Sequence, residues 1–199
     1  MEKGLFDFYK AALSGELTSP LCADYKNEWR TCGDDKERLI CLAMRQQSIP
    51  YVVSHAYKGF GLDKEYIKRE FGDYINGHVL KDCDNVEGYT YQLWVDMDSK
   101  EPVTLSSDVA SLMYCDNVSV LIPQTKCNTI YVSNRSSVHF TLDGFNSVQI
   151  YLFDESNVVI EDCDDTCSVL VYKYNSRANV ELGKYCMGKV KIFNKTLRL

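Results

Sequence analysis

The chain has 199 residues, of which 45% are hydrophobic and 25% are charged, and its formal net charge is −6. This composition is typical of a folded domain and argues against disorder, while the mild negative charge argues against binding nucleic acid through a large positive field. No apolar run approaches the ~20 residues that span a bilayer, and the N-terminus lacks the layout of a signal peptide, so we expect a cytoplasmic protein.

Residues 1–77 predict a helical module, expected to be a small bundle of four or five helices. Apolar residues recur at helical spacing in several short segments. Asp34 is expected to cap one helix, with Glu37 completing a capping box, and Asp63 is expected to cap another. The expected helices cover residues 4–14, about 20–32, an almost wholly apolar segment around 39–44, 51–57 and 64–74.

Residues 78–116 predict a connector between the helical module and the C-terminal part of the chain. Residues 89–95 are aromatic and β-branched, which favours a strand, and residues 103–105 favour a second one. The apolar side of this connector would cover the first coil of a following repeat, because the end of a repeat stack otherwise exposes its core to water.

Residues 117–199 contain an internal repeat and predict a repeat domain. A small polar residue is followed by valine or isoleucine and then by alternating apolar residues, and eight such phrases occur at a mean spacing of about ten residues. The polar residue before each valine predicts a column of hydrogen bonds from coil to coil. The apolar phrases begin at Val118, Ile130, Val138, Val148, Val158, Val169, Val180 and Val190.

Every second phrase gives the more informative spacing. Val148, Val169 and Val190 follow one another at intervals of 21 residues. The same interval separates three aromatic residues, Tyr151, Tyr172 and Phe193. A unit with two unlike halves predicts a narrow β-solenoid of about 21 residues per coil and two strands per turn, in which like residues stack at ~4.8 Å. The predicted class is α+β, with an antiparallel β-meander as the alternative for the repeat.

The repeated phrase also carries a resemblance. The Ser/Asn-x-Val-x-apolar pattern of residues 137–182 resembles that of uncharacterised short-repeat β-solenoid proteins of gut Bacteroidales and their phages or mobile elements. The order of a helical front and a repeat back is similar to that of hypothetical proteins from the same sources. The resemblance implies a β-solenoid in the cytoplasm of a bacterial host, and it implies no catalytic or binding residues.

Two features of the repeat are candidate partner-binding surfaces. Between Ser136 and Tyr172 there are seven acids and no lysine or arginine, which indicates either solvated turns or a surface for a cationic partner. The aromatic column, if it faces outward, is an apolar stripe of the kind found at interfaces. The predicted partner-binding residues are Asp154, Glu155, Glu161, Asp162, Asp164, Asp165, Tyr151, Tyr172, Tyr174 and Phe193.

Cysteine and histidine positions argue against a metal or catalytic centre. Nine cysteines without a signal peptide indicate free thiols in a reducing compartment. Cys163 and Cys167 form the closest pair, but no second pair or nearby histidine accompanies them, so buried thiols are favoured over a zinc site. The three histidines stand apart, and no glycine-rich phosphate loop occurs. No catalytic residue, metal or cofactor is predicted.

These observations favour a non-enzymatic protein–protein interaction module over an enzyme. The expected partner is a protein with a cationic surface, or a second copy of the chain, and direct binding of nucleic acid is not expected. A concrete form is an inhibitor from a phage or mobile element that acts on a host defence protein. The alternatives are a structural component of a phage particle and a carbohydrate-active or glycan-binding protein, in which Asp143 would meet Asp162 or Asp164 across coils.

Overall fold

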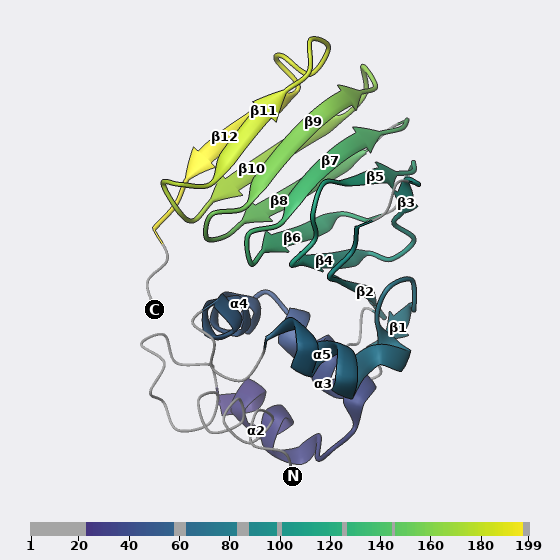
Figure 1. Cartoon of the computed structure of the whole chain (residues 1–199), viewed down its shortest axis with the longest axis vertical. Helices are drawn as coiled ribbons and strands as arrows, with labels where there is room; N and C mark the ends of the chain where they lie inside the picture. The colour runs from purple at the N-terminus through teal and green to yellow at the C-terminus, as the bar shows by residue number, and fades with distance from the viewer. Residues whose placement is uncertain are drawn as a thin grey trace.

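The computed structural model describes residues 23–57, 63–82, 88–98, 101–124, 127–144 and 146–196. Figure 1 shows a group of helices at one end of the molecule and a stack of strands that leads away from them toward the C-terminus. The helix predicted over residues 4–14 lies outside the described residues. Within them, no helix is both long and apolar enough to cross a membrane.

The helices are short, and the first turn of two of them is fixed by an aspartate. The Asp63 carboxylate accepts a hydrogen bond from the Tyr66 backbone N–H at 2.8 Å, as predicted. The other cap was predicted one residue too early, because Asp35 rather than Asp34 accepts from the Arg38 N–H at 3.1 Å. The helical elements are α2 (Ala23–Thr31), α3 (Lys36–Met44), α4 (Ile49–Tyr57), α5 (Lys64–Phe71) and the 3-10 turn η1 (Gly72–Tyr74).

Twelve strands follow in the described residues, most of them five or six residues long. β5, β7 and β8 have the buried and exposed alternation that their valine-rich sequences predict, whereas β2, β4 and β6 are buried along almost their whole length. The strands are β1 (Leu80–Lys81), β2 (Thr90–Val95), β3 (Val103–Thr104), β4 (Val109–Met113), β5 (Val118–Ile122), β6 (Thr129–Ser133), β7 (Ser137–Leu142), β8 (Ser147–Leu152), β9 (Asn157–Cys163), β10 (Ser168–Lys173), β11 (Asn179–Leu182) and β12 (Val190–Asn194).

From β2 onward, successive strands alternate between two sheets, which makes this part of the chain a β-solenoid of about five turns. Sheet A has the order β1-β2-β4-β6-β8-β10-β12, and sheet B has the order β11-β9-β7-β5-β3. Apart from the antiparallel pair β1 and β2, the ladders of both sheets are parallel. The predicted β-solenoid is therefore confirmed and the alternative antiparallel meander is wrong. Val169 pairs with Val148 on one side and with Val190 on the other.

The parallel ladder begins within residues 78–116, the segment predicted as a connector. Tyr91 of β2 pairs with Val109 of β4, and Val103 of β3 pairs with Val120 of β5. These strands therefore belong to the solenoid. The pairing partners in β2 and β4 are only 18 residues apart, so the first turn is shorter than the later ones.

Serines hold one corner of the coil. Ser136 and Ser156 are fully buried; the Ser136 hydroxyl accepts from the Cys115 N–H at 3.0 Å, and the Ser156 hydroxyl accepts from the Ser136 N–H at 3.1 Å. These bonds run from coil to coil, as predicted for the column of Asn and Ser before each valine. The residues that make them stand one position earlier in the chain than predicted, because the strand-starting residues Ser137 and Asn157 are not buried.

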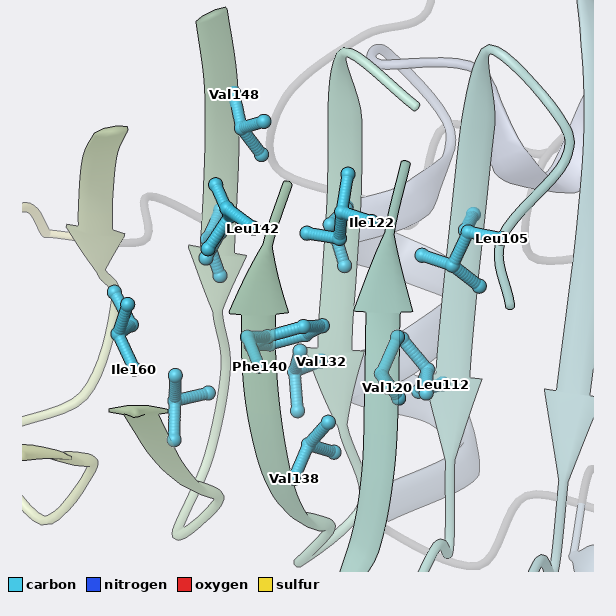
Figure 2. Close-up of a cluster of buried hydrophobic side chains, with 14 of the residues drawn as sticks. Leu105, Leu112, Val120, Ile122, Val132, Val138, Phe140, Leu142, Val148 and Ile160 are labelled. Atoms are coloured by element: carbon cyan, nitrogen blue, oxygen red, sulfur yellow. The ribbon is translucent and has the colours of Figure 1, made fainter. Parts of the chain in front are cut away.

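The interior of the solenoid is a closed apolar layer between the two sheets. Figure 2 shows Val120 beside Leu112 and Phe140 beside Val132 between the two sheets, with Ile160 further along the same buried layer. All of these side chains are at most 1% exposed. Burial declines in the last turn, where Val180, Leu182 and Val190 are only partly buried, because in the described part of the chain no further coil covers them.

A second core joins the helices to the outer face of sheet A. Trp29 and Leu42 from the helices are fully buried and belong to the same cluster as Leu93, Tyr131 and Phe153 from the sheet. The helices therefore cover β2, β4 and β6, as Figure 1 shows, and leave the later strands of the sheet open. The molecule has three layers at its N-terminal end and two at its C-terminal end.

One buried ion-pair network lies at the edge of the helical layer. The Arg45 guanidinium contacts the Asp82 carboxylate through Nε at 2.9 Å and Nη2 at 3.0 Å, and it also pairs with Glu28. Burial alone would lower the pKa of Arg45, but the hydrogen bonds and charges of Asp82 and Glu28 raise it overall. This arginine ties the turn after α3 to α2 and to the segment after β1.

Candidate functional site

The predicted column of Tyr151, Tyr172 and Phe193 exists on the outer face of sheet A, and Tyr131, which was not predicted, begins it. Tyr131, Tyr151, Tyr172 and Phe193 stack in chain order, with ring centroids 5.3, 5.0 and 5.4 Å apart. The parallel register places them side by side, since Tyr172 pairs with both Tyr151 and Phe193. A shorter parallel column pairs Phe153 with Tyr174 at 5.1 Å. We call these two columns together the aromatic ladder.

The rings of the aromatic ladder face one another. The interplanar angles are 26° between Tyr151 and Tyr172 and 20° between Tyr172 and Phe193. From Tyr151 to Phe193 the ring faces are therefore used within the ladder, whereas the Tyr131 ring is tilted by 42° against that of Tyr151. Exposure rises along the ladder, from 2% at Tyr131 to 40% at Phe193, because the helices cover only its start. The outer face of Phe193 is the one open end of this stack in the described residues.

Two of the predicted acids, Asp154 and Glu155, lie at the corner between β8 and β9, and both have structural partners. Asp154 accepts hydrogen bonds from the backbone N–H groups of Asn134 and Arg135, and burial raises the pKa of its carboxyl. Glu155 pairs with Arg177 at 2.5 Å and with Arg135 at 3.4 Å. These two acids hold neighbouring coils together.

The other four predicted acids lie in β9 or at its far end. Glu161 contacts Nδ1 of His139 at 2.7 Å on the outer face of sheet B. Asp164 accepts from the Thr166 N–H at 3.0 Å within its turn, which holds the pKa of its carboxyl below the ordinary value. Asp165 pairs with Lys189 at 2.8 Å.

The structure therefore does not bring the six predicted acids into one patch. Asp154 and Glu155 precede β9, whereas Asp162 lies near the end of this seven-residue strand and Asp164 and Asp165 follow it, so most of a strand, roughly 20 Å at the usual rise, separates the two groups. The aromatic ladder lies on the other sheet from Glu161 and His139. The acids are close together in the sequence, but in the structure one group lies at the start of β9 and the other at its far end.

A surface that the sequence did not predict lies at the C-terminal end. We call residues 173–196 the open coil. Six lysines and arginines and one acid occur there, although the whole chain has a net charge of −6. Four of the six large hydrophobic side chains that are exposed among the described residues belong to it: Tyr185 (66%), Met187 (79%), Ile192 (42%) and Phe193 (40%). The available signal was the lysine that replaces Ser or Asn before the last valine phrase.

In the part of the chain that the structure describes, β12 is the edge strand of sheet A. Lys189 and Lys195 bond to β10 through their backbone, the Lys189 carbonyl accepting from Val169 and the Lys195 N–H donating to Lys173. Because hydrogen bonding alternates along a strand, the N–H and C=O groups of Val190, Ile192 and Asn194 face the free edge. The side chains of Lys191 and Phe193 then point to the outer face of the sheet.

A cleft of about 700 Å³ lies between the helical layer and the outer face of sheet A. Its walls combine tyrosines with amide side chains. Its arginine is already ion-paired with Asp82 and Glu28, and its aspartate accepts two hydrogen bonds from Thr90. The lining residues are Tyr25, Met44, Arg45, Gln46, Tyr89, Tyr91, Asp108, Val109, Asn128, Thr129, Tyr131, Gln149 and Tyr151.

The cysteines of the described segments are free and buried. Cys163 and Cys186 approach with their sulfurs 3.2 Å apart, and burial together with this contact raises the pKa of the Cys163 thiol to about 12. Burial likewise raises the pKa of Cys115 to about 11. Among the described residues, no group of three or more histidine, cysteine, aspartate or glutamate side chains is placed to hold a metal ion.

We expect these thiols to resist alkylation in the folded protein. Only the thiolate reacts, and at about pH 8 a thiol with a pKa near 12 is almost entirely protonated. Iodoacetamide should therefore modify Cys115 and Cys163 at least about a hundredfold more slowly in the native protein than in guanidinium chloride, with the native rate rising as the pH is raised. Peptide mapping by mass spectrometry measures both rates; rapid native labelling at either residue would contradict the burial described.

Taken together, the two parallel sheets and their alternating strands define the chain as a β-solenoid protein with a helical layer on one face. No family model matches the sequence, and no curated protein or solved structure shows a significant similarity to it.

Proposed function

We propose that this chain is a non-enzymatic protein-interaction module that binds another protein through the open coil. The observation that carries the proposal is the concentration of exposed apolar side chains in the turn before β12, Tyr185 and Met187, and in β12 itself, Ile192, together with the free edge that β12 has among the described residues. Exposed apolar patches and unpaired strand edges both favour association with other chains.

The acids of the repeat support this proposal less well than the open coil does. Glu155, Glu161 and Asp165 each already contact a basic side chain of the chain itself, so a cationic partner would have to compete with those contacts. In this proposal the C-terminal repeat is built from coils of about 21 residues, and a small helical bundle covers the outer face of sheet A at the N-terminal end of the solenoid. An inhibitor from a phage or mobile element, acting on a host defence protein, is the setting we propose, and it rests on the sequence resemblance alone.

The choice between the two surfaces can be tested by comparing variants in affinity capture from the native host. We expect proteins retained by the wild-type chain to be lost with Ile192→Asp, which places a charge in the exposed apolar patch. They should be retained by a variant with Glu161, Asp162, Asp164 and Asp165 all changed to lysine. Quantitative mass spectrometry gives the ratio for each retained protein.

If the captured proteins were instead retained by Ile192→Asp and lost when the four acids are changed to lysine, the acidic residues in and after β9 would be the binding surface. Circular dichroism of each variant is the control for folding. Identical capture by all three chains would exclude both surfaces.

A second candidate function is the binding of a neutral glycan in the cleft. Its volume of about 700 Å³ is in the range of small-molecule sites, and Gln46, Asn128 and Gln149 offer amide groups beside tyrosine rings. The charged side chains that line it are satisfied within the protein, which favours an uncharged ligand. A glycan array read with the wild type and with Asn128→Ala would test this function, and the absence of any signal that depends on Asn128 would remove it.

A further inference from the structure

We propose that the open coil binds an acidic partner segment with an aromatic residue at its centre, which adds to β12 as a further parallel strand of sheet A. This inference rests on the proposed function, because it names the kind of partner that the open coil would take. Three independent features of β12 define that partner: its free backbone groups, the end of the aromatic ladder and its charge.

The backbone provides the site for strand addition. Val190, Ile192 and Asn194 direct their N–H and C=O groups to the free edge, as the bonds of Lys189 and Lys195 to β10 require. Main-chain hydrogen bonds of this kind give affinity in strand addition, and alternate side chains give specificity. All the long ladders of sheet A are parallel, and a parallel partner strand would continue the same twist and side-chain register.

The aromatic ladder defines the side chain at the centre of the partner strand. Phe193 stacks on Tyr172 with one face and is 40% exposed, so its other face is open. The ring centroids along this column are 5.0 to 5.4 Å apart, close to the spacing between neighbouring strands. An aromatic residue opposite Phe193 would extend the column by one ring, and such pairs stabilise a contact beyond the area that they bury.

The two lysines that flank Phe193 define which residues the partner strand should carry on either side of its aromatic residue. Lys191 in β12 and Lys195, which directly follows β12 and continues its bonding to β10, flank Phe193 at alternate positions of the chain and therefore on the same side. Lys195 lies over the Tyr172 ring at 5.4 Å, and in the described structure neither lysine has a carboxylate partner. A parallel strand with acids opposite both lysines would gain two cross-strand ion pairs, whereas lysines there would be repelled.

The same charges disfavour a second copy of the chain as the occupant. Two β12 edges related by a twofold axis would pair antiparallel, and a pairing centred on Phe193 would place Lys191 of one copy opposite Lys195 of the other. Like charges directly opposite destabilise a strand pair, and lysines on an edge strand are a common defence against such self-association. A partner of opposite charge meets no such penalty.

The test uses peptides that copy β12. An acidic peptide carries glutamate in place of both lysines and tyrosine in place of phenylalanine, and a matched basic peptide keeps the lysines. Fluorescence anisotropy of the labelled peptides measures binding to the full chain. We expect the acidic peptide to bind at least about tenfold more tightly at low salt, with the difference shrinking at high salt. The preference should reverse in the double variant Lys191→Glu, Lys195→Glu.

A proline tests the backbone part of the inference. Ile192→Pro removes an N–H that faces the free edge and leaves the bonds between β12 and β10 in place, a position that edge strands tolerate. We expect it to abolish binding of the acidic peptide, while Ile192→Thr, which keeps the N–H, reduces binding much less. Circular dichroism and thermal denaturation of both variants check that the solenoid remains folded.

Each other outcome has a definite meaning. Equal binding of both peptides, lost in Ile192→Pro, would overturn the acidic partner but leave the open coil as the binding surface. Failure of both peptides to bind, or binding that Ile192→Pro does not change, would overturn strand addition, and the affinity-capture comparison would still decide the proposed function. A wild-type dimer in sedimentation velocity that Ile192→Pro dissociates would make a second copy the occupant and overturn the inference.

Discussion

Replacing Arg45 with methionine is expected to lower the free energy of unfolding by about 3–5 kcal/mol, the usual cost of breaking a buried ion pair from one side. The Asp82 side chain is only 2% exposed and accepts two hydrogen bonds from the guanidinium. Without the arginine its carboxylate would stay buried with its principal counter-charge gone. Urea denaturation followed by circular dichroism measures the change.

The double variant Arg45→Met, Asp82→Leu isolates the cause. If the loss comes from the uncompensated carboxylate, removing it should recover much of the stability, because an apolar pair of similar volume often replaces a buried ion pair at little cost. Glu28 can remain, since its side chain is 27% exposed and reaches water. A double variant no more stable than the single one would show instead that Arg45 acts through the packing of its aliphatic part and its contact with the Tyr25 ring.

Gly183→Ala is expected to detach or strain the open coil, at a cost of about 1–3 kcal/mol or more. A Cβ at this position would lie 2.0 Å from the Glu161 carbonyl oxygen and 2.9 Å from its carbon, and neither backbone atom can move without shifting β9. The contact arises at a β-bulge, where the register between β7 and β9 changes after Phe140 and Glu161 is the extra residue. Glycine permits this close approach of two backbones.

The matched control is Gly72→Ala, because a Cβ there meets nothing within 4 Å. We expect hydrogen exchange of Gly183→Ala to accelerate in β11 and β12 while the amides of β4 to β8 keep their protection. Thermal denaturation gives the overall loss of stability. If Gly183→Ala were as stable as the control, the two backbones could not approach as closely as described.

The features that the sequence predicted correctly depend either on residues close together in the chain or on a regular repeat. The recurrence of Val148, Val169 and Val190 predicted stacked parallel strands, because identical side chains can form a column only when neighbouring strands run in the same direction and register. The aromatic ladder followed from the same argument. The Asp63 cap was also predictable, since a cap involves residues only three positions apart.

The acidic surface was not predictable in the same way. Seven acids without an intervening lysine or arginine suggested one patch, but whether neighbours in sequence are neighbours on the surface depends on where the coil turns. The basic side chains that contact Glu155, Glu161 and Asp165 lie 20 or more residues away in sequence, one coil before or after. These acid–base contacts could be identified only once the positions of the strands and corners were known, because the partners come from neighbouring coils.

The sequence alone favoured the β-solenoid over a meander and predicted the inward side chains and the stacking of Tyr151, Tyr172 and Phe193, because these depend on a periodicity that is written along the chain. Tertiary structure decided which part of the aromatic ladder is exposed. The helices cover Tyr131 and Phe153 and stop short of Phe193, and no periodicity encodes where a separate layer ends. It also decided that the open coil, with Ile192 and Phe193 beside a free strand edge, is the surface most suited to binding, because exposure is a property of the packed layers and not of the repeat.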